Sequence, residues 1–451
     1  MTASFAAQQD PNAWTDPVTK AALIGTALMA SGNFSERIIP GGEESNPQQY
    51  VVLALWLVIV AVSYFRRSLL QLEPTPSVLL ALAPYALAVA SFAWSDNPGA
   101  SLPKAVALLI VTFGAYRLAM TMALDAIVDC VILGTFLLAA ASVLLALFVP
   151  DIGVLTDFQH PGQWNGIFVS KQTLGIHGAL LLFFAAYRLM EPPRALYHCL
   201  AALTAIACVI GSGSRGGGAI AVAGVVFVYG ARRSTLFSKI VAFAPFAMCL
   251  VASVLIAYFV WTGNQSLQAF DKEIDFTERT FIWQYALSFF TSAPLLGYGV
   301  NGFWTLKEVK DVFLERHGWF LDNFHDGYIG IVVETGALGF VSFAASYFAY
   351  GRRIAASIAE RGAIERDVAL TLTYTCILFF IDFTETFFLR STNLFSALLS
   401  LSVFIGFAQS APTRRESAAF PPEPATRYAP PQPRETYVAN NDGVSRSPAR
   451  R

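Results

Sequence analysis

The sequence predicts an all-α polytopic membrane protein of about 12 transmembrane helices, and three features carry that prediction. Of its 451 residues, 55% are hydrophobic and only 14% are charged, a balance far more apolar than that of an average soluble domain. The apolar residues are gathered into runs of about 20 residues, the length that crosses the hydrocarbon core of a bilayer. The charged residues lie mainly between these runs. An ordinary soluble enzyme is therefore excluded.

The apolar runs give the order of the expected elements. The first of them, 20–32, is short and is followed by polar residues, so it is either a span or a segment lying in the membrane interface. The other expected spans cover residues 49–65, 75–94, 102–120, 125–149, 172–190, 195–211, 216–231, 238–261, 326–350, 367–388 and 391–409. The chain is thus divided into an N-terminus over 1–19, a bundle of about nine helices over 20–261, a large loop over 262–324, three helices over 325–410 and a tail over 411–451.

Basic residues in the short loops predict the orientation, because Lys and Arg concentrate on the cytoplasmic side of a membrane protein. If the spans alternate, the basic loops fall on one face, at Arg66-Arg67, Arg117, 188–194, Arg232-Arg233, Arg352-Arg353 and the tail from Arg414. Both termini are then cytoplasmic and the loop 262–324 is periplasmic. Lys20 is the only basic residue among the first 20, so no cleaved signal peptide is expected. The tail is rich in Pro, Arg, Ser and Glu, which is typical of disorder.

Charge and cysteine content exclude several classes of partner and cofactor. The net charge of −1 provides no basic field for nucleic acid. The five cysteines lie in apolar runs without CxxC spacing, which favours small core residues over a disulfide framework or a zinc cluster. The histidines lack the paired spacing of a metal-binding helix. We expect neither a metal nor a cofactor.

The long loop before the third-last span contains the densest polar and aromatic sequence in the chain. Arg279 and Trp283 are four residues apart and share one face if the segment is helical, although Trp283 alone also fits an interfacial anchor. The glycines of 294–304 allow either a close backbone approach to a ligand or a sharp turn. Segment 304–317 has the pattern of a surface helix lying on the membrane or over a cavity, where it can act as a lid.

His325 follows this loop and begins the next span. Asp322 or Asn323 can cap that helix, which places the imidazole in the first turn near the positive end of the helix dipole. A histidine there stays neutral and can accept a proton from a hydroxyl group. A hydrogen-bonded cap residue without chemistry is the alternative.

Two more basic residues begin spans on the same face. Arg215 follows the turn 211–214 and precedes three glycines, so it lies among exposed backbone N–H groups that suit an anion such as a lipid diphosphate. Close helix packing, with Arg215 extended to lipid headgroups, is the alternative. Lys171 can neutralise a phosphate or a headgroup. The turn lacks the Gly-Lys-Ser/Thr ending of a P-loop, so nucleotide hydrolysis is not expected.

Acidic residues inside or near the last spans support a different class of function. Glu334, Asp382 and Glu385 are functional candidates because ionisable groups at such depth are costly. In a transporter or flippase they would couple transport to an ion gradient. The absence of a visible repeat or a matched pair of broken helices weakens this interpretation.

The motifs together resemble one known superfamily. In chain order they are Ser214-Arg215-Gly216, Arg279-Thr-Phe-Ile-Trp283, Pro294 to Trp304, His325-Asp-Gly-Tyr328 and Glu334-Thr-Gly336. With this order, spacing and common face, the chain resembles the O-antigen ligase and Wzy-like polysaccharide polymerase superfamily, and looks most similar to its exopolysaccharide polymerase branch. The resemblance implies a fold like that of the GT-C type glycosyltransferases.

The resemblance also implies an activity in the bacterial inner membrane. In that family, a lipid-linked glycan presents its undecaprenyl diphosphate to periplasmic arginines, and a histidine activates the acceptor hydroxyl. Carried over by motif, His325 is the general base and Arg215 and Arg279 bind the diphosphate. Lys171 and Trp283 are expected as supporting residues. The implied substrate is an undecaprenyl-diphosphate oligosaccharide, without metal or cofactor, and the implied partners are membrane lipid, a flippase and a chain-length regulator.

Two positions depart from the family pattern. Asp326 stands where Asn is common, and it can orient His325 or raise its basicity. Glu278 stands where Gly is common, and it can hold Arg279. The resemblance leaves open whether the enzyme polymerises repeat units or, as a ligase, transfers finished glycan to lipid A core; a transporter or flippase is the alternative of another class.

Overall fold

The computed structural model describes residues 16–31, 34, 47–156, 158, 160–190, 196–262, 267–269, 272–274, 279–317 and 321–410. The chain divides into two units, Met1–Ala411 and Pro412–Arg451, and all described residues belong to the first. The predicted disordered tail lies outside the described residues, as does Glu278.

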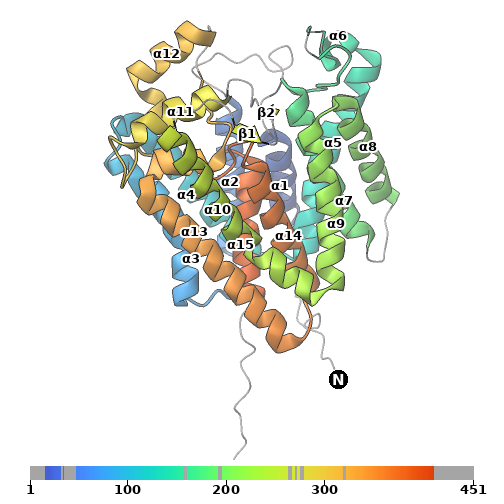
Figure 1. Ribbon diagram of the computed structural model, residues 1–451. Helices are drawn as coiled ribbons and strands as arrows, with labels where there is room; N and C mark the ends of the chain where they lie inside the picture. The colour runs from blue at the N-terminus through green and yellow to red at the C-terminus, as the bar shows by residue number, and fades with distance from the viewer. Residues whose placement is uncertain are drawn as a thin grey trace, which may run out of the picture. The chain divides into compact units, whose positions relative to one another are not determined.

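Each expected span contains a helix, and these helices pack side by side (Figure 1). Their bounds are α1 Pro17–Met29, α2 Pro47–Tyr64, α3 Pro76–Ala90, α4 Pro98–Thr121, α5 Leu124–Phe148, α7 Lys171–Leu189, α8 Leu196–Ser212, α9 Arg215–Arg233, α10 Thr235–Thr262, α13 Gly327–Arg361, α14 Arg366–Ile381 and α15 Leu394–Gln409. Among the described helices, six are long and apolar enough to cross a membrane, namely α2, α3 with the turn that follows it, α4, α5, α10 and α13. The fold class, a helical polytopic membrane protein, is confirmed, whereas the count of 12 spans stays a prediction.

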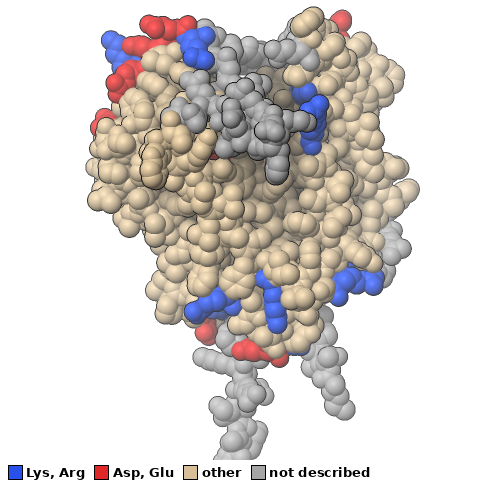
Figure 2. Space-filling view, in the orientation of Figure 1, with Lys and Arg blue, Asp and Glu red and all other residues tan. Residues whose placement is uncertain are grey.

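The distribution of apolar side chains fits a bilayer. Helices α8 and α10 expose large aliphatic side chains, including Leu203, Ile210, Leu250 and Val254, and such surfaces are stable when they face lipid. Figure 2 shows a broad uncharged band on this face, between two ends that carry Lys, Arg, Asp and Glu.

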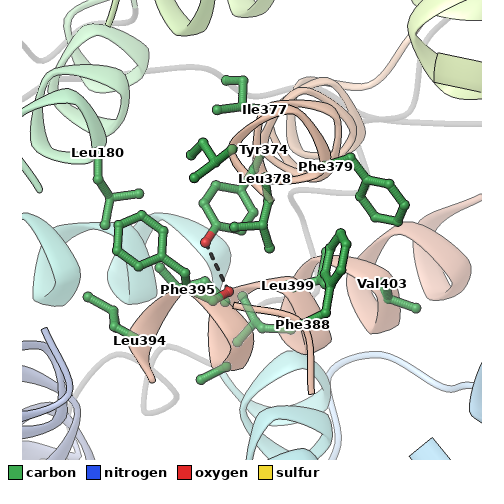
Figure 3. Close-up of a cluster of buried hydrophobic side chains, with 14 of the residues drawn as sticks. Leu180, Tyr374, Ile377, Leu378, Phe379, Phe388, Leu394, Phe395, Leu399 and Val403 are labelled. Carbon is green, nitrogen blue, oxygen red and sulfur yellow. Dashed lines mark hydrogen bonds between the residues drawn. The ribbon is translucent and has the colours of Figure 1, made fainter. Parts of the chain in front are cut away.

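The last two helices form the centre of the core. In α14 and α15 almost every residue is buried, as expected for helices that are apolar on all sides. Figure 3 shows where they meet α7: Leu180, Leu378, Leu399 and Phe395 pack together, and the Tyr374 hydroxyl donates to the Phe395 carbonyl at 3.0 Å. This core thus holds together helices α7, α14 and α15.

The described parts of the segment between α10 and α13 form strands and helices. They contain the antiparallel strands β1 Leu267–Ala269 and β2 Lys272–Ile274, α11 Arg279–Phe290, a 3-10 turn Phe303–Thr305 and α12 Lys307–His317. Helix α12 confirms the expected surface helix: it buries Val309 and Phe313 and exposes its charged side chains. A short helix, α6 Pro150–Gly153, follows α5.

Helix α13 is broken at Gly336, and the preceding loop docks into the break. Gly336 has φ 68° and ψ −171°, a conformation that is essentially restricted to glycine. The amides of Tyr298 and Gly299 donate to the carbonyls of Val333 and Glu334 at 3.0 and 2.8 Å. In return, the amides of Ala337 and Leu338 donate to the carbonyls of Pro294 and Leu295. The Pro-Leu-Leu-Gly-Tyr-Gly and Glu-Thr-Gly motifs are therefore two halves of one joint.

Two expected spans have different ends in the structure. The span expected over 367–388 ends as a helix at Ile381, because the Asp382 carboxylate accepts from the amides of Phe387 and Phe388 and closes a loop. The span expected over 326–350 continues to Arg361.

Candidate functional site

A polar cavity of about 530 Å³ opens at the end of the bundle where α1 ends and α2, α4, α7 and α15 begin. We call this end the site end. The first residue of α11 and the loops 300–301, 322–325 and 385–393 complete the walls. The charged or titratable side chains lining it are Lys104, Arg279, Asp322, His325, Glu385 and Arg390, with His177 on the wall formed by α7.

His325 is held at the cavity wall by the loop that precedes α13. Its φ of 52° is a left-handed conformation that histidine tolerates better than most residues. Its N–H donates to Asn323 Oδ1 at 2.9 Å. Its Nδ1 atom is buried and has no hydrogen-bond partner in the described part of the chain. His325 precedes the cap of α13, which is Asp326 and not Asp322 or Asn323, so it does not lie in the first turn as expected. Burial, with the nearby Arg279 cation, lowers the pKa of His325 to about 4, so the ring is neutral at pH 7.

Arg279 and Glu385 face each other in the same cavity. Arg279 Nη2 lies 3.8 Å from Glu385 Oε1, and both side chains are largely buried. Burial raises the pKa of Glu385 to about 7, against the opposing effect of Arg279. The structure thus brings together His325 and Arg279, as the sequence predicts, and adds Glu385 beside them.

Trp283 supports the His325 loop. Its indole N–H donates to the Phe324 carbonyl at 2.9 Å, and its ring packs edge-on against Phe259. The side chain is only 4% exposed, so Trp283 is buried and is not an interfacial anchor. Because Phe324 directly precedes His325, this hydrogen bond fixes the position from which the imidazole extends.

Asp326 has a different contact from the one expected. Its Oδ1 accepts from the Ile329 amide at 2.8 Å and caps α13, and its own N–H donates to Thr386 Oγ1 at 3.1 Å. No hydrogen bond joins the Asp326 carboxyl to the His325 ring within the described ranges. The Asp326 carboxyl group is engaged by the helix end, and its influence on the orientation or basicity of His325 stays a prediction. Burial raises the pKa of Asp326 to about 8, although the amides of Ile329 and Tyr328 oppose the shift.

Arg215 and Lys171 lie at the site end but outside the cavity lining. Arg215 is exposed at the start of α9, where the Ser214 hydroxyl accepts from the Gly217 amide. It forms no hydrogen bond or ion pair with the part of the chain that the structure describes. Lys171 Nζ lies 3.2 Å from His160 Nδ1. The expected pair of Arg215 and Arg279 is therefore split between the outer surface and the cavity.

The sequence did not single out two cations of the cavity. Arg390 Nη1 lies 3.0 Å from Glu334 Oε1, and Lys104 Nζ donates to Gln49 Oε1 at 2.7 Å. Both residues lie in or beside expected apolar spans, where an isolated basic residue is itself a signal of function. That signal was available, since Lys104 falls within 102–120 and Arg390 immediately before 391–409.

The buried acidic residues are used to fix loops. Glu334 Oε1 also accepts from the Asn301 amide at 3.1 Å, so this carboxylate ties the docked loop to Arg390. The backbone carbonyl of Asp382 accepts from the Gly327 amide at 2.7 Å, which joins the 382–388 loop to the start of α13. Within the described ranges, no three His, Cys, Asp or Glu side chains converge as a metal site requires.

Two comparisons relate this chain to known proteins. Residues 200–344 match the family model described as O-Antigen ligase. The chain is also 26% identical over 302 residues to the "Exopolysaccharide production protein ExoQ" of Rhizobium meliloti (strain 1021). That alignment covers 64% of this chain and 66% of the relative, just under two thirds of its length.

All of the motifs that carry the resemblance lie within the matched region. They are the turn before α9, the start of α11, the docked loop, the His325 segment and the break in α13, from Ser214 to Gly336. The similarity to the O-antigen ligase family over residues 200–344 agrees with the resemblance expected from these motifs.

Proposed function

We propose that the protein is an inner-membrane glycosyltransferase that joins undecaprenyl-diphosphate-linked oligosaccharide repeat units into exopolysaccharide on the periplasmic face. The observation that carries the proposal is that a neutral imidazole, His325, and a guanidinium, Arg279, line one cavity. The family match supports the reaction class, and the similarity to an exopolysaccharide production protein supports exopolysaccharide as the product.

The reaction follows from the chemistry of these groups. The His325 ring accepts the proton of the acceptor hydroxyl while that oxygen attacks the anomeric carbon of the donor sugar. The bond from the anomeric carbon to the diphosphate oxygen breaks, and its electron pair stays on the leaving diphosphate. Arg279 stabilises the developing negative charge, and Lys104 and Arg390 add positive charge to the same cavity. The diphosphate is already an activated leaving group, so positioning and charge stabilisation suffice.

Arg279 also links donor binding to the basicity of His325. In the empty cavity the Arg279 cation helps to lower the pKa of His325. A bound diphosphate neutralises this cation, which makes the imidazole a stronger base when the donor is in place. Glu385, whose pKa lies near 7, holds Arg279 until then.

Arg215 and Lys171 take part at an earlier stage in this proposal. Both lie at helix starts on the site end, outside the cavity, where backbone N–H groups and positive charge favour an anion. There they bind the diphosphate while the lipid tail remains in the bilayer, before the headgroup reaches Arg279.

The experiment is the size and attachment of surface and secreted glycan in a deletion strain complemented with wild type, His325→Ala or His160→Ala. His160 is the matched control, since it is a histidine of the site end outside the cavity lining. We expect wild type and His160→Ala to restore long secreted polymer and His325→Ala to leave single repeat units. Normal polymer from stably inserted His325→Ala protein would remove the role of His325.

A ligase that transfers finished glycan to lipid A core is the second candidate, because the matched family model carries the name O-Antigen ligase. In that case the deletion strain accumulates finished long chains on the lipid carrier. A transporter or flippase is disfavoured because Glu334 is engaged by Arg390, and Glu385 by Arg279. Unchanged glycan in the deletion strain would favour a transporter or flippase.

A further inference from the structure

A second histidine, His177, lines the cavity and takes no part in the reaction proposed above. It lies on α7, one turn after Thr173, and is 7% exposed. Its ring packs between two phenyl rings, with centroids 5.0 Å from Phe168 and 5.1 Å from Phe395. These contacts fix the plane of the imidazole.

The hydrogen bonding of the ring leaves one nitrogen without a partner. His177 Nδ1 lies 2.8 Å from the Thr173 carbonyl oxygen. A carbonyl oxygen only accepts hydrogen bonds, so Nδ1 must carry the proton. The other nitrogen, Nε2, is buried and has no partner in the described part of the chain. In the neutral imidazole it is therefore an acceptor that awaits a donor.

Such an atom is costly in a folded protein unless a ligand or another group supplies its partner. Buried polar atoms almost always have a hydrogen-bond partner, and an unpaired one costs about 1–3 kcal/mol. The surrounding wall of the cavity carries uncharged donors and acceptors, among them Ser170, Gln172 and Thr173. Amides, hydroxyls and aromatic rings suit a neutral, hydroxyl-rich ligand better than a diphosphate.

We propose that His177 binds a saccharide hydroxyl through Nε2. The inference rests on the proposed function and divides the cavity in two. The charged part, with Arg279 and Arg390, receives the diphosphate, and the part formed by α7 holds a sugar ring. The hydroxyl belongs either to the donor glycan or to the acceptor glycan, and the two sources are separated by which KM changes.

The test uses two variants, each of which retains a hydrogen-bonding group at the position of one imidazole nitrogen. The amide of His177→Asn reaches the position of Nδ1 and can still donate to the Thr173 carbonyl, but nothing replaces Nε2. The longer His177→Gln places an amide where Nε2 lay. Purified wild type and variants are assayed with a lipid-diphosphate oligosaccharide donor and a lipid-free oligosaccharide acceptor, each varied in turn.

We expect His177→Asn to raise the KM for one of the two glycans about tenfold, the effect of one lost hydrogen bond, with kcat near that of wild type. His177→Gln should stay within about threefold of wild type. An unchanged KM for both substrates in His177→Asn would overturn the proposal, as would equal losses in kcat for both variants.

A measurement on the wild-type protein guards against variants that fold poorly. With nitrogen-labelled histidine, saturation by the lipid-free oligosaccharide or by the donor should shift the Nε2 resonance of His177. No shift with either would also overturn the proposal. His325→Gln separates this outcome from failure of the proposed function. If His325→Gln is fully active, the function itself is wrong; if it is inactive while His177 is insensitive, only the sugar-binding role is lost.

Discussion

The joint between the docked loop and α13 leads to a sharp prediction about Gly336. In Gly336→Ala, a methyl group would overlap the backbone of Leu295 and Leu296, and φ 68° with ψ −171° is nearly forbidden to alanine. The backbone strain is worth about 1–3 kcal/mol, and the overlap with the docked loop adds about 1–3 kcal/mol. We therefore expect a total cost of about 2–6 kcal/mol.

Gly362, an ordinary left-handed helix cap with ψ 2°, provides the control. It has the same φ of 68°, but a methyl group there would meet open space, so Gly362→Ala should cost only the strain of a left-handed residue, about 1–2 kcal/mol. The assay is thermal unfolding of both purified variants in the same detergent. The drop in Tm should be at least about twofold larger for Gly336→Ala than for Gly362→Ala. Equal drops would refute the interpretation that the conformation of Gly336 and the docked backbone together make this glycine necessary.

Three further predictions concern the site. Trp283→Phe leaves the buried Phe324 carbonyl without its donor, which costs about 1–3 kcal/mol, so polymer synthesis by stably inserted protein should fall; full activity would contradict the positioning role of Trp283. Because the Arg279 cation helps to lower the pKa of His325, Arg279→Gln should make the His325 ring titrate at higher pH. An unchanged titration, followed by the histidine resonances, would show that Arg279 does not act on the imidazole. The pKa of Glu385 is raised by burial to about 7, so its contribution to stability is complete below about pH 4.5 and is lost as the pH rises through about 7. Glu385→Gln should consequently gain in Tm relative to wild type between pH 5 and 8, and a constant difference over this range would argue against the raised pKa.

Sequence periodicity predicted the helices well, because a run of apolar residues crossing a bilayer has few alternatives to a helix. The prediction failed where a side chain or another segment of the chain forms hydrogen bonds with the backbone. The helix that begins at Arg366 ends at Ile381 because the Asp382 side chain closes a loop. A hydropathy profile contains no information about such a hydrogen bond. The break at Gly336 depends on a loop about 40 residues earlier, at 294–299.

The sequence predicted only part of the site, because it does not show which distant residues the fold brings together. His325 and Arg279 are marked by their motifs and do share a cavity. Arg215 is marked in the same way but lies outside the cavity lining. A motif predicts at which end of the bundle a residue lies, but it does not predict the direction of the side chain. Lys104 and Arg390 reach the cavity from elements far apart in sequence, and only the packing of α4 and the 385–393 loop brings them together.

The exchange of four backbone hydrogen bonds at the break in α13 has a consequence for biogenesis. A helix interrupted inside a membrane leaves carbonyl and amide groups that lipid cannot satisfy. The chain segment that satisfies them, 294–299, leaves the ribosome before α13 is synthesised. Insertion of α13 therefore depends on a segment already translated, and a truncation or swap of the preceding loop is expected to impair integration of the last three helices, even though their own sequences are unchanged.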